Sequence, residues 1–118
     1  MVDDLNDSLS QISGSILSSV EFVLDYLQLK FDGPTLTTYT QPSVSIGGKT
    51  ISWGQSCYRD ALCDRIGIRV VRTNIIDSVE LTIDFEDAAV FTVSLRPEDY
   101  RGIEAVYFTG GIGGFWVI

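Results

Sequence analysis

Apolar and polar residues alternate along most of this chain, which is typical of β-strands with one buried face. The clearest example is residues 26–31, where Leu27, Leu29 and Phe31 share one face and the sequence Asp-Gly-Pro then forms a turn. By the same criterion the sequence predicts further strands over residues 16–23, 35–40, 43–46, 50–53, 68–76, 79–85, 89–95, 104–108 and 114–118.

Two segments have apolar residues at helical spacing instead. We expect one helix over residues 3–12 and a second over residues 56–66, with Ser56 as the N-cap of the second helix and Gly67 directly after it. A helix followed by three strands therefore occurs twice. This order predicts an α+β fold, with a mainly antiparallel sheet of about six to eight strands and one or two helices on one face.

A weak internal repeat relates residues 4–41 to residues 58–95. At an offset of 54 residues, Leu27 and Phe31 correspond to Leu81 and Phe85, and residues 12–41 share four identities with residues 66–95. The chain has 118 residues, without a linker of low complexity. We therefore predict a single domain over residues 1–118 in which the repeat, if real, is internal.

The charge balance narrows the range of functions. Sixteen Asp and Glu residues outnumber eight Lys and Arg residues, which gives a formal net charge of −8, and histidine is absent. Such a chain would repel nucleic acid, and it lacks the commonest metal ligand and the side chain that shuttles protons near neutral pH. We expect no metal, no cofactor and no nucleic-acid partner.

The cellular compartment can also be predicted from the sequence. The first seven residues are acidic, whereas a secretory signal begins with positive charge, and no apolar run approaches the length of a membrane-spanning helix. Cys57 and Cys63 would lie ~9 Å apart along the second helix, which is too far for a disulfide. We therefore expect a cytoplasmic protein with reduced thiols that does not contact a membrane.

Candidate catalytic groups are few. Cys57 is the only reasonable nucleophile, but no histidine can serve as its base, so we expect a small buried residue there. The acids Asp84, Glu86 and Asp87 are expected to be solvated turn residues. The glycines over residues 110–114 precede a strand and not a helix, which indicates a hairpin loop and not a phosphate-binding loop.

A group of four arginines, Arg59, Arg65, Arg69 and Arg72, is the one local basic patch. We expect internal ion pairs with neighbouring acids and not an anion site. Other aromatic and arginine residues lie beside turns or chain ends, where they would either anchor a protein interface or cover one end of the sheet. The candidate binding residues are Trp53, Tyr58, Arg59, Tyr100, Arg101 and Trp116.

Three stretches, over residues 22–34, 58–67 and 93–105, together carry a resemblance. Over residues 12–108 the chain resembles a family of short, uncharacterised bacterial proteins, a domain of unknown function loosely grouped with the immunity proteins of toxin systems. The resemblance implies no activity and assigns no functional residue.

The leading hypothesis from the sequence is a non-enzymatic module that binds another protein of basic character. An immunity-type inhibitor of a basic toxin is one concrete version. The alternative is a small-molecule-binding domain or a thiol-dependent enzyme centred on Cys57, and a homodimer is a third possibility.

Overall fold

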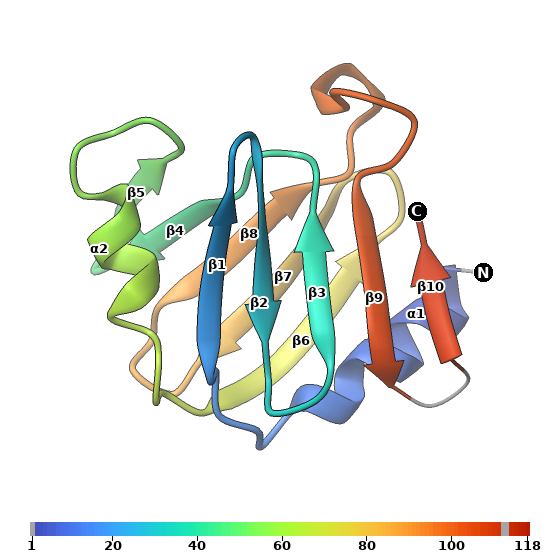
Figure 1. Cartoon of the computed structure of the whole chain (residues 1–118), viewed down its shortest axis with the longest axis horizontal. Coiled ribbons are helices and arrows are strands. Elements are labelled where there is room, and N and C mark those ends of the chain that lie inside the picture. Colours follow the sequence, from blue (N-terminus) through green and yellow to red (C-terminus); the bar gives the residue numbers. More distant parts are fainter. Residues whose placement is uncertain (1, 112–113) are drawn as a thin grey trace.

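The computed structural model describes residues 2–111 and 114–118, which form two antiparallel sheets of five strands each (Figure 1). The first sheet contains, in spatial order, β1 (Ser19–Val23), β2 (Tyr26–Lys30), β3 (Thr35–Thr38), β9 (Val106–Gly111) and β10 (Gly114–Val117). The second contains, in spatial order, β5 (Lys49–Ser52), β4 (Ser43–Ile46), β8 (Val90–Ser94), β7 (Glu80–Phe85) and β6 (Val70–Ile76).

The α+β class and the antiparallel pairing are confirmed, but the prediction of one sheet is not. The strands divide over two sheets because both have an apolar face that needs cover, and a single apolar core lies between them. In β7 and β8 buried residues alternate with half-buried ones, as the sequence pattern predicts. Phe31, Phe91 and Phe108 are among the largest fully buried side chains.

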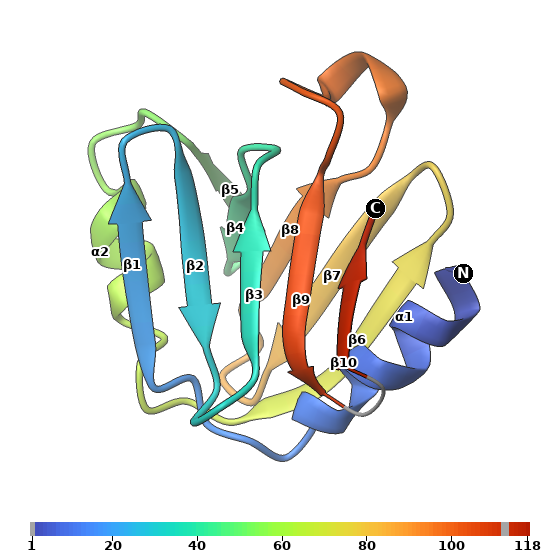
Figure 2. The same cartoon turned by 45° about the vertical axis from the view of Figure 1, so that its right-hand side comes forward.

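The helices close the two open sides of this sandwich and do not cover one face of a sheet (Figures 1 and 2). Helix α1 (Val2–Leu9), continued by a 3-10 helix (Ser10–Ile12), contacts β6 and β9. Helix α2 (Tyr58–Cys63) contacts β1, β4 and β5. Each helix thus packs against strands of both sheets, with the apolar stripe of α1 and Leu62 of α2 in the core.

The second helix is shorter than the sequence predicts. Regular helical geometry begins only at Tyr58, and residues 64–67 form turns in place of the final helical turn expected up to Ile66. Gly67 ends this segment with a φ of +91°, a conformation that glycine adopts without penalty. Because the helix stops early, Ile66 is partly exposed at 43% and does not extend the apolar stripe.

The two halves of the chain repeat the same order of elements. Each half has a helix, a meander of three strands and a two-stranded hairpin. Each hairpin joins the sheet of the other half: β4 pairs with β8, and β9 pairs with β3. Both sheets therefore consist of a meander from one half and a hairpin from the other, so the two halves cross over.

The linkers that follow the two helices pair with one another in a symmetric way. The amide of Gly14 donates to the Val70 carbonyl, and 53 residues later the amide of Gly67 donates to the Leu17 carbonyl, both at 2.8 Å. The amides of Leu17 and Val70 return equivalent bonds to the carbonyls of Ile68 and Ser15, at 3.1 and 2.8 Å. An approximate twofold axis thus passes between the linkers, where Ile16 and Arg69 form an antiparallel bridge.

Candidate functional site

Four connections meet at one end of the sandwich, the upper end in Figure 1. They are the β1–β2 turn, the β3–β4 connection, the β5–α2 loop and the long β8–β9 connection, which includes a 3-10 helix (Pro97–Asp99). We call this region the loop end. Antiparallel hairpins bring these connections together, although they come from residues 24 to 105 of the chain.

Hydrogen bonds join the connections of the loop end. The Arg101 guanidinium donates to the Asp25 carbonyl oxygen at 3.0 Å and lies 4.0 Å from the Asp25 carboxylate. The Gln41 side-chain oxygen, oriented toward Arg101 and Trp53, accepts from Arg101 Nη1 at 2.9 Å and from Trp53 Nε1 at 3.3 Å. One arginine and one amide therefore connect all four segments.

Tyr58 anchors helix α2 beneath the loop end. Its side chain is 3% exposed, and its hydroxyl donates to the Pro42 carbonyl oxygen at 2.8 Å. Burial raises the pKa of the Tyr58 phenol well above its ordinary value, so the ring stays neutral over the physiological range. Tyr58 is therefore a packed structural residue whose ring also contacts those of Phe22 and Trp53.

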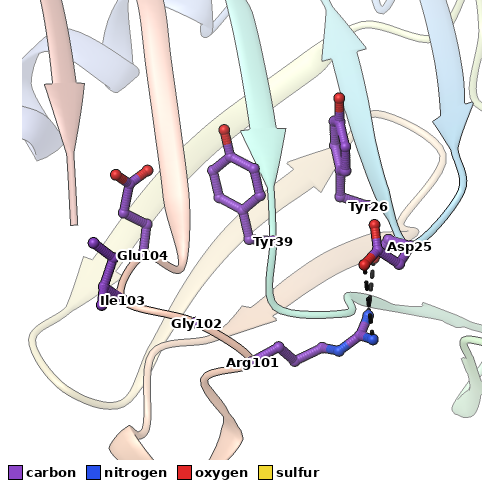
Figure 3. Close-up of a pocket in the computed structure, with 7 residues that line it drawn as sticks. All are labelled: Asp25, Tyr26, Tyr39, Arg101, Gly102, Ile103 and Glu104. Carbon is purple, nitrogen blue, oxygen red and sulfur yellow. Dashed lines mark hydrogen bonds and ion pairs between the residues drawn. The ribbon is translucent and has the colours of Figure 1, made fainter.

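The first open cavity of the loop end has a volume of about 290 Å³ (Figure 3). It is lined by Asp25, Tyr26, Tyr39, Arg101, Gly102, Ile103 and Glu104. The rings of Tyr26 and Tyr39 stand side by side, with centroids 5.5 Å apart and a tilt of 47° between them. Partial burial, and then the nearby Glu104 carboxylate, raise the pKa of Tyr39 above its ordinary value.

A second open cavity, of about 550 Å³, lies on the other side of the β1–β2 turn. It is lined by Phe22, Leu24, Trp53, Gly54, Gln55, Ser56, Tyr58 and Arg59. The Arg59 guanidinium lies over the Phe22 ring, 5.9 Å from its centroid, within the range of a cation–π contact. Both cavities thus combine aromatic rings with an arginine, the residue types that dominate the energetics of protein interfaces.

Two aliphatic side chains project from the loop end into solvent. Leu24 is 98% exposed and Ile103 is 94% exposed, the highest values among the large apolar residues of the part of the chain that the structure describes. Leu24 borders the second cavity and Ile103 borders the first. Contact with water stabilises neither side chain, whereas burial in a complex would stabilise both.

The backbone of Leu24 is also strained. It occupies the first position of the two-residue turn between Val23 and Tyr26, with a φ of +33°. Hairpin turns with positive φ at this position favour glycine, because a Cβ atom clashes there with the backbone. Leu24 therefore combines a strained backbone with an almost fully exposed side chain.

Replacing Leu24 by glycine is expected to raise the free energy of unfolding by about 0.5–1 kcal/mol, because glycine relieves the strain at positive φ. Urea denaturation monitored by circular dichroism measures this gain. The Leu24→Ala variant is the matched control, since alanine removes the exposed side chain but keeps the Cβ atom. An equal gain from alanine, or a loss from glycine, would contradict the assignment of strain.

Four of the six candidate binding residues line the two cavities of the loop end. Trp53, Tyr58 and Arg59 line the second cavity, and Arg101 lines the first. Tyr100 and Trp116 line neither of these cavities: both pack against the core, Trp116 on β10 opposite Phe108. For these two residues the structure fits the interpretation that they cover the core.

Sequence reasoning missed Leu24, Tyr26, Tyr39 and Ile103. In the sequence Leu24 follows directly on a run that predicts a strand, and Tyr26 and Tyr39 fall within predicted strands. Leu24 would have been expected to be exposed only if a turn had been predicted at residues 24–25. That turn was not predicted, because neither residue is a glycine, proline or asparagine.

The arginine group forms internal ion pairs, as expected, for three of its members. Arg65 contacts Asp87 at 3.1 Å and Arg69 contacts Glu86 at 3.6 Å, while Arg72 bonds to Asp84. The partners are the turn acids, whose carboxylates remain partly exposed to solvent, at 24% for Asp84, 66% for Glu86 and 33% for Asp87. Arg59 is the exception, because its guanidinium lies over an aromatic ring.

The thiols are placed differently from the sequence-based expectation. Cys57 is exposed at the start of α2, and not buried, because its side chain precedes the helical face that packs on the core. Cys63 is exposed as well, and both are free. Cys57 lines neither cavity of the loop end.

Other sequence candidates are placed as follows. The glycine-rich segment joins β9 to β10, so a strand and not a helix follows it; Ile112 and Gly113 lie outside the described residues. Among residues 2–111 and 114–118, no group of three or more Cys, Asp or Glu residues is arranged to hold a metal ion. Within the same ranges, no helix has both the length and the apolar character needed to cross a membrane.

Comparison with known proteins adds no relative to this description. No family model, no curated protein and no solved structure matches the chain.

Proposed function

We propose that this protein is a non-enzymatic module that binds another protein through its loop end. The observation that carries the proposal is the pair of almost fully exposed aliphatic residues, Leu24 and Ile103, which border two cavities rich in aromatic and arginine side chains. Interface centres combine an apolar anchor with such residues, and hydrogen bonds already hold the connections of the loop end in place.

The partner is a basic protein. A net charge of −8 on 118 residues attracts a positively charged protein over a distance and speeds its association. An immunity-type inhibitor that blocks a basic toxin is the concrete version that we favour. Such an inhibitor needs a stable surface, and the hydrogen bonds between the connections of the loop end support one.

The test is cross-linking in the native host, followed by purification of each captured protein and direct measurement of its affinity. The proposal predicts a partner of positive net charge whose affinity falls as ionic strength rises. It also predicts a toxin gene beside the gene for this protein, and protection of cells that express the toxin. An acidic partner, or a catalytic turnover lost on replacing one side chain, would contradict it.

A second function, the binding of a small molecule, is favoured by the larger cavity of about 550 Å³ beside Trp53 and Arg59. Its volume lies within the range of ligand pockets. The thiol-dependent version of this alternative requires Cys57 to be activated, yet Cys57 does not line the cavity.

The thiol-dependent version can be tested by alkylation. We expect Cys57 and Cys63 to react with iodoacetamide at neutral pH at rates within roughly threefold of one another, because both are exposed and the chain has no histidine to act as a base. Mass spectrometry of peptides after timed quenching gives both rates. A Cys57 that reacts far faster than Cys63 would support thiol chemistry.

A further inference from the structure

The smaller cavity of the loop end has a defined chemical character. Figure 3 shows the side chains of Glu104, Tyr39 and Tyr26 side by side, with the carboxylate and the two hydroxyls pointing the same way. The three residues come from neighbouring segments. Glu104 precedes β9, Tyr39 follows directly after β3, and Tyr26 begins β2. The cavity, of about 290 Å³, therefore offers two aromatic rings and the Glu104 carboxylate, with the Asp25–Arg101 pair at its edge.

The positive charge at the edge of the cavity is already engaged. Arg101 extends toward Asp25 and away from Glu104, and its guanidinium is bonded to the Asp25 carbonyl and to Gln41. Glu104, in contrast, forms no ion pair with any residue that the structure describes. The cavity thus has a carboxylate without a cation beside Tyr39, and Tyr26 lies on the other side of Tyr39.

We propose that this cavity binds a lysine or arginine side chain of the partner protein. The inference rests on the proposed function and names the side chain that the partner contributes. A cation over the face of Tyr39 or Tyr26 is attracted by the ring quadrupole, and Glu104 supplies the opposite charge. The net charge of −8 also attracts a positively charged partner over a longer distance.

Ile103 completes the match to such a side chain. Lysine and arginine carry a flexible apolar stem behind the charged group, and that stem gains by lying on apolar surface. Ile103 is 94% exposed at the edge of the cavity, beside Glu104. A basic side chain that reaches the carboxylate would therefore cover Ile103 with its methylene groups, which a small inorganic cation could not do.

Short peptides test the inference on the full-length protein. The probe is acetyl-Gly-Arg-Gly-amide, and its neutral counterpart carries citrulline, which has nearly the same shape without the charge. Two-dimensional NMR titration is expected to show weak, millimolar binding of the arginine peptide, with the largest shifts at the ring protons of Tyr26 and Tyr39. The citrulline peptide is expected to bind at least about five-fold more weakly.

A matched pair of variants locates the charge. Glu104→Gln is expected to weaken binding of the arginine peptide by about three- to ten-fold. Glu98→Gln makes the same change of charge in the same connection, at an exposed residue that does not line the cavity, and is expected to leave the affinity unchanged. Circular dichroism confirms that both variants remain folded.

Equal binding of the two peptides, an unchanged affinity in Glu104→Gln, or shifts that lie away from Tyr26 and Tyr39 would each overturn the inference. None of these results would alter the test of the proposed function, which measures the partner protein itself. If the affinity of the partner depends on Leu24 and Ile103 but not on Glu104, the proposed function stands and only the proposed cation site is excluded.

Discussion

Replacing Leu24 and Ile103 together by serine is expected to weaken binding of the partner protein by roughly a hundred-fold. Each truncation removes a fully exposed aliphatic group that would become buried in the complex. We expect each single variant to lose about ten-fold, which corresponds to about 1.4 kcal/mol. Serine leaves the net charge unchanged, so isothermal titration calorimetry with the purified partner measures the apolar contribution alone.

The same variants separate binding from folding. Both side chains are almost completely exposed, so the free energy of unfolding should change by no more than about 0.5 kcal/mol. Ile66→Ser is the matched control. Ile66 is an aliphatic residue that is 43% exposed, and it lies near the residues that precede β1, whereas Leu24 follows the last residue of β1. Partner affinity that is unaffected by the double variant, or lost equally in the control, would exclude the loop end as the binding surface.

Replacing Phe108 by alanine is expected to destabilise the protein by about 3–5 kcal/mol. Phe108 is fully buried on β9, paired with Leu36 of β3 and Trp116 of β10, at the place where the second hairpin joins the first sheet. The substitution leaves a cavity there. Because each sheet contains strands of both halves, we expect the whole domain to lose stability in one transition.

Urea denaturation of single-tryptophan variants checks both parts of this expectation. Trp116 lies on a strand of the first sheet, and Trp53 follows directly after β5 of the second, so the two residues report on different sheets. Phe115→Ala is the matched control, since Phe115 is 62% exposed on the neighbouring strand and its loss should cost less than about 1 kcal/mol. Separate midpoints for the two tryptophans, or a similar cost for both phenylalanines, would contradict the prediction.

Local pattern was sufficient to predict most of the individual elements. The alternation of Leu27, Leu29 and Phe31 identifies β2 and its buried face, and the spacing of Leu5, Leu9 and Ile12 identifies the first helix together with its 3-10 extension. These patterns are informative because a strand or an amphipathic helix shows its buried face within a few residues.

The division into two sheets could not be predicted in the same way. It depends on which strand pairs with β3 and with β8, and each of these strands pairs with one that is distant in sequence. A strand's own pattern shows that one face is buried but not what covers it. The sequence therefore favoured one sheet where the molecule builds two.

The candidate site was predicted in part. Trp53, Arg59 and Arg101 were found because aromatic and arginine residues beside turns are unusual enough to notice. Leu24 and Ile103 were not found, because an exposed leucine and a buried leucine look alike in a sequence. The structure adds the exposure of both residues and the positive φ of Leu24.

The crossing of the hairpins also bears on the weak internal repeat, which stays a prediction about ancestry. A half-length chain with this order of elements would have an open edge at its third strand and a hairpin with no sheet of its own to join. Two such chains that exchanged hairpins would satisfy each other and form a twofold dimer. Fusion of the pair into one polypeptide would leave the arrangement seen here, with each hairpin paired to the meander of the other half.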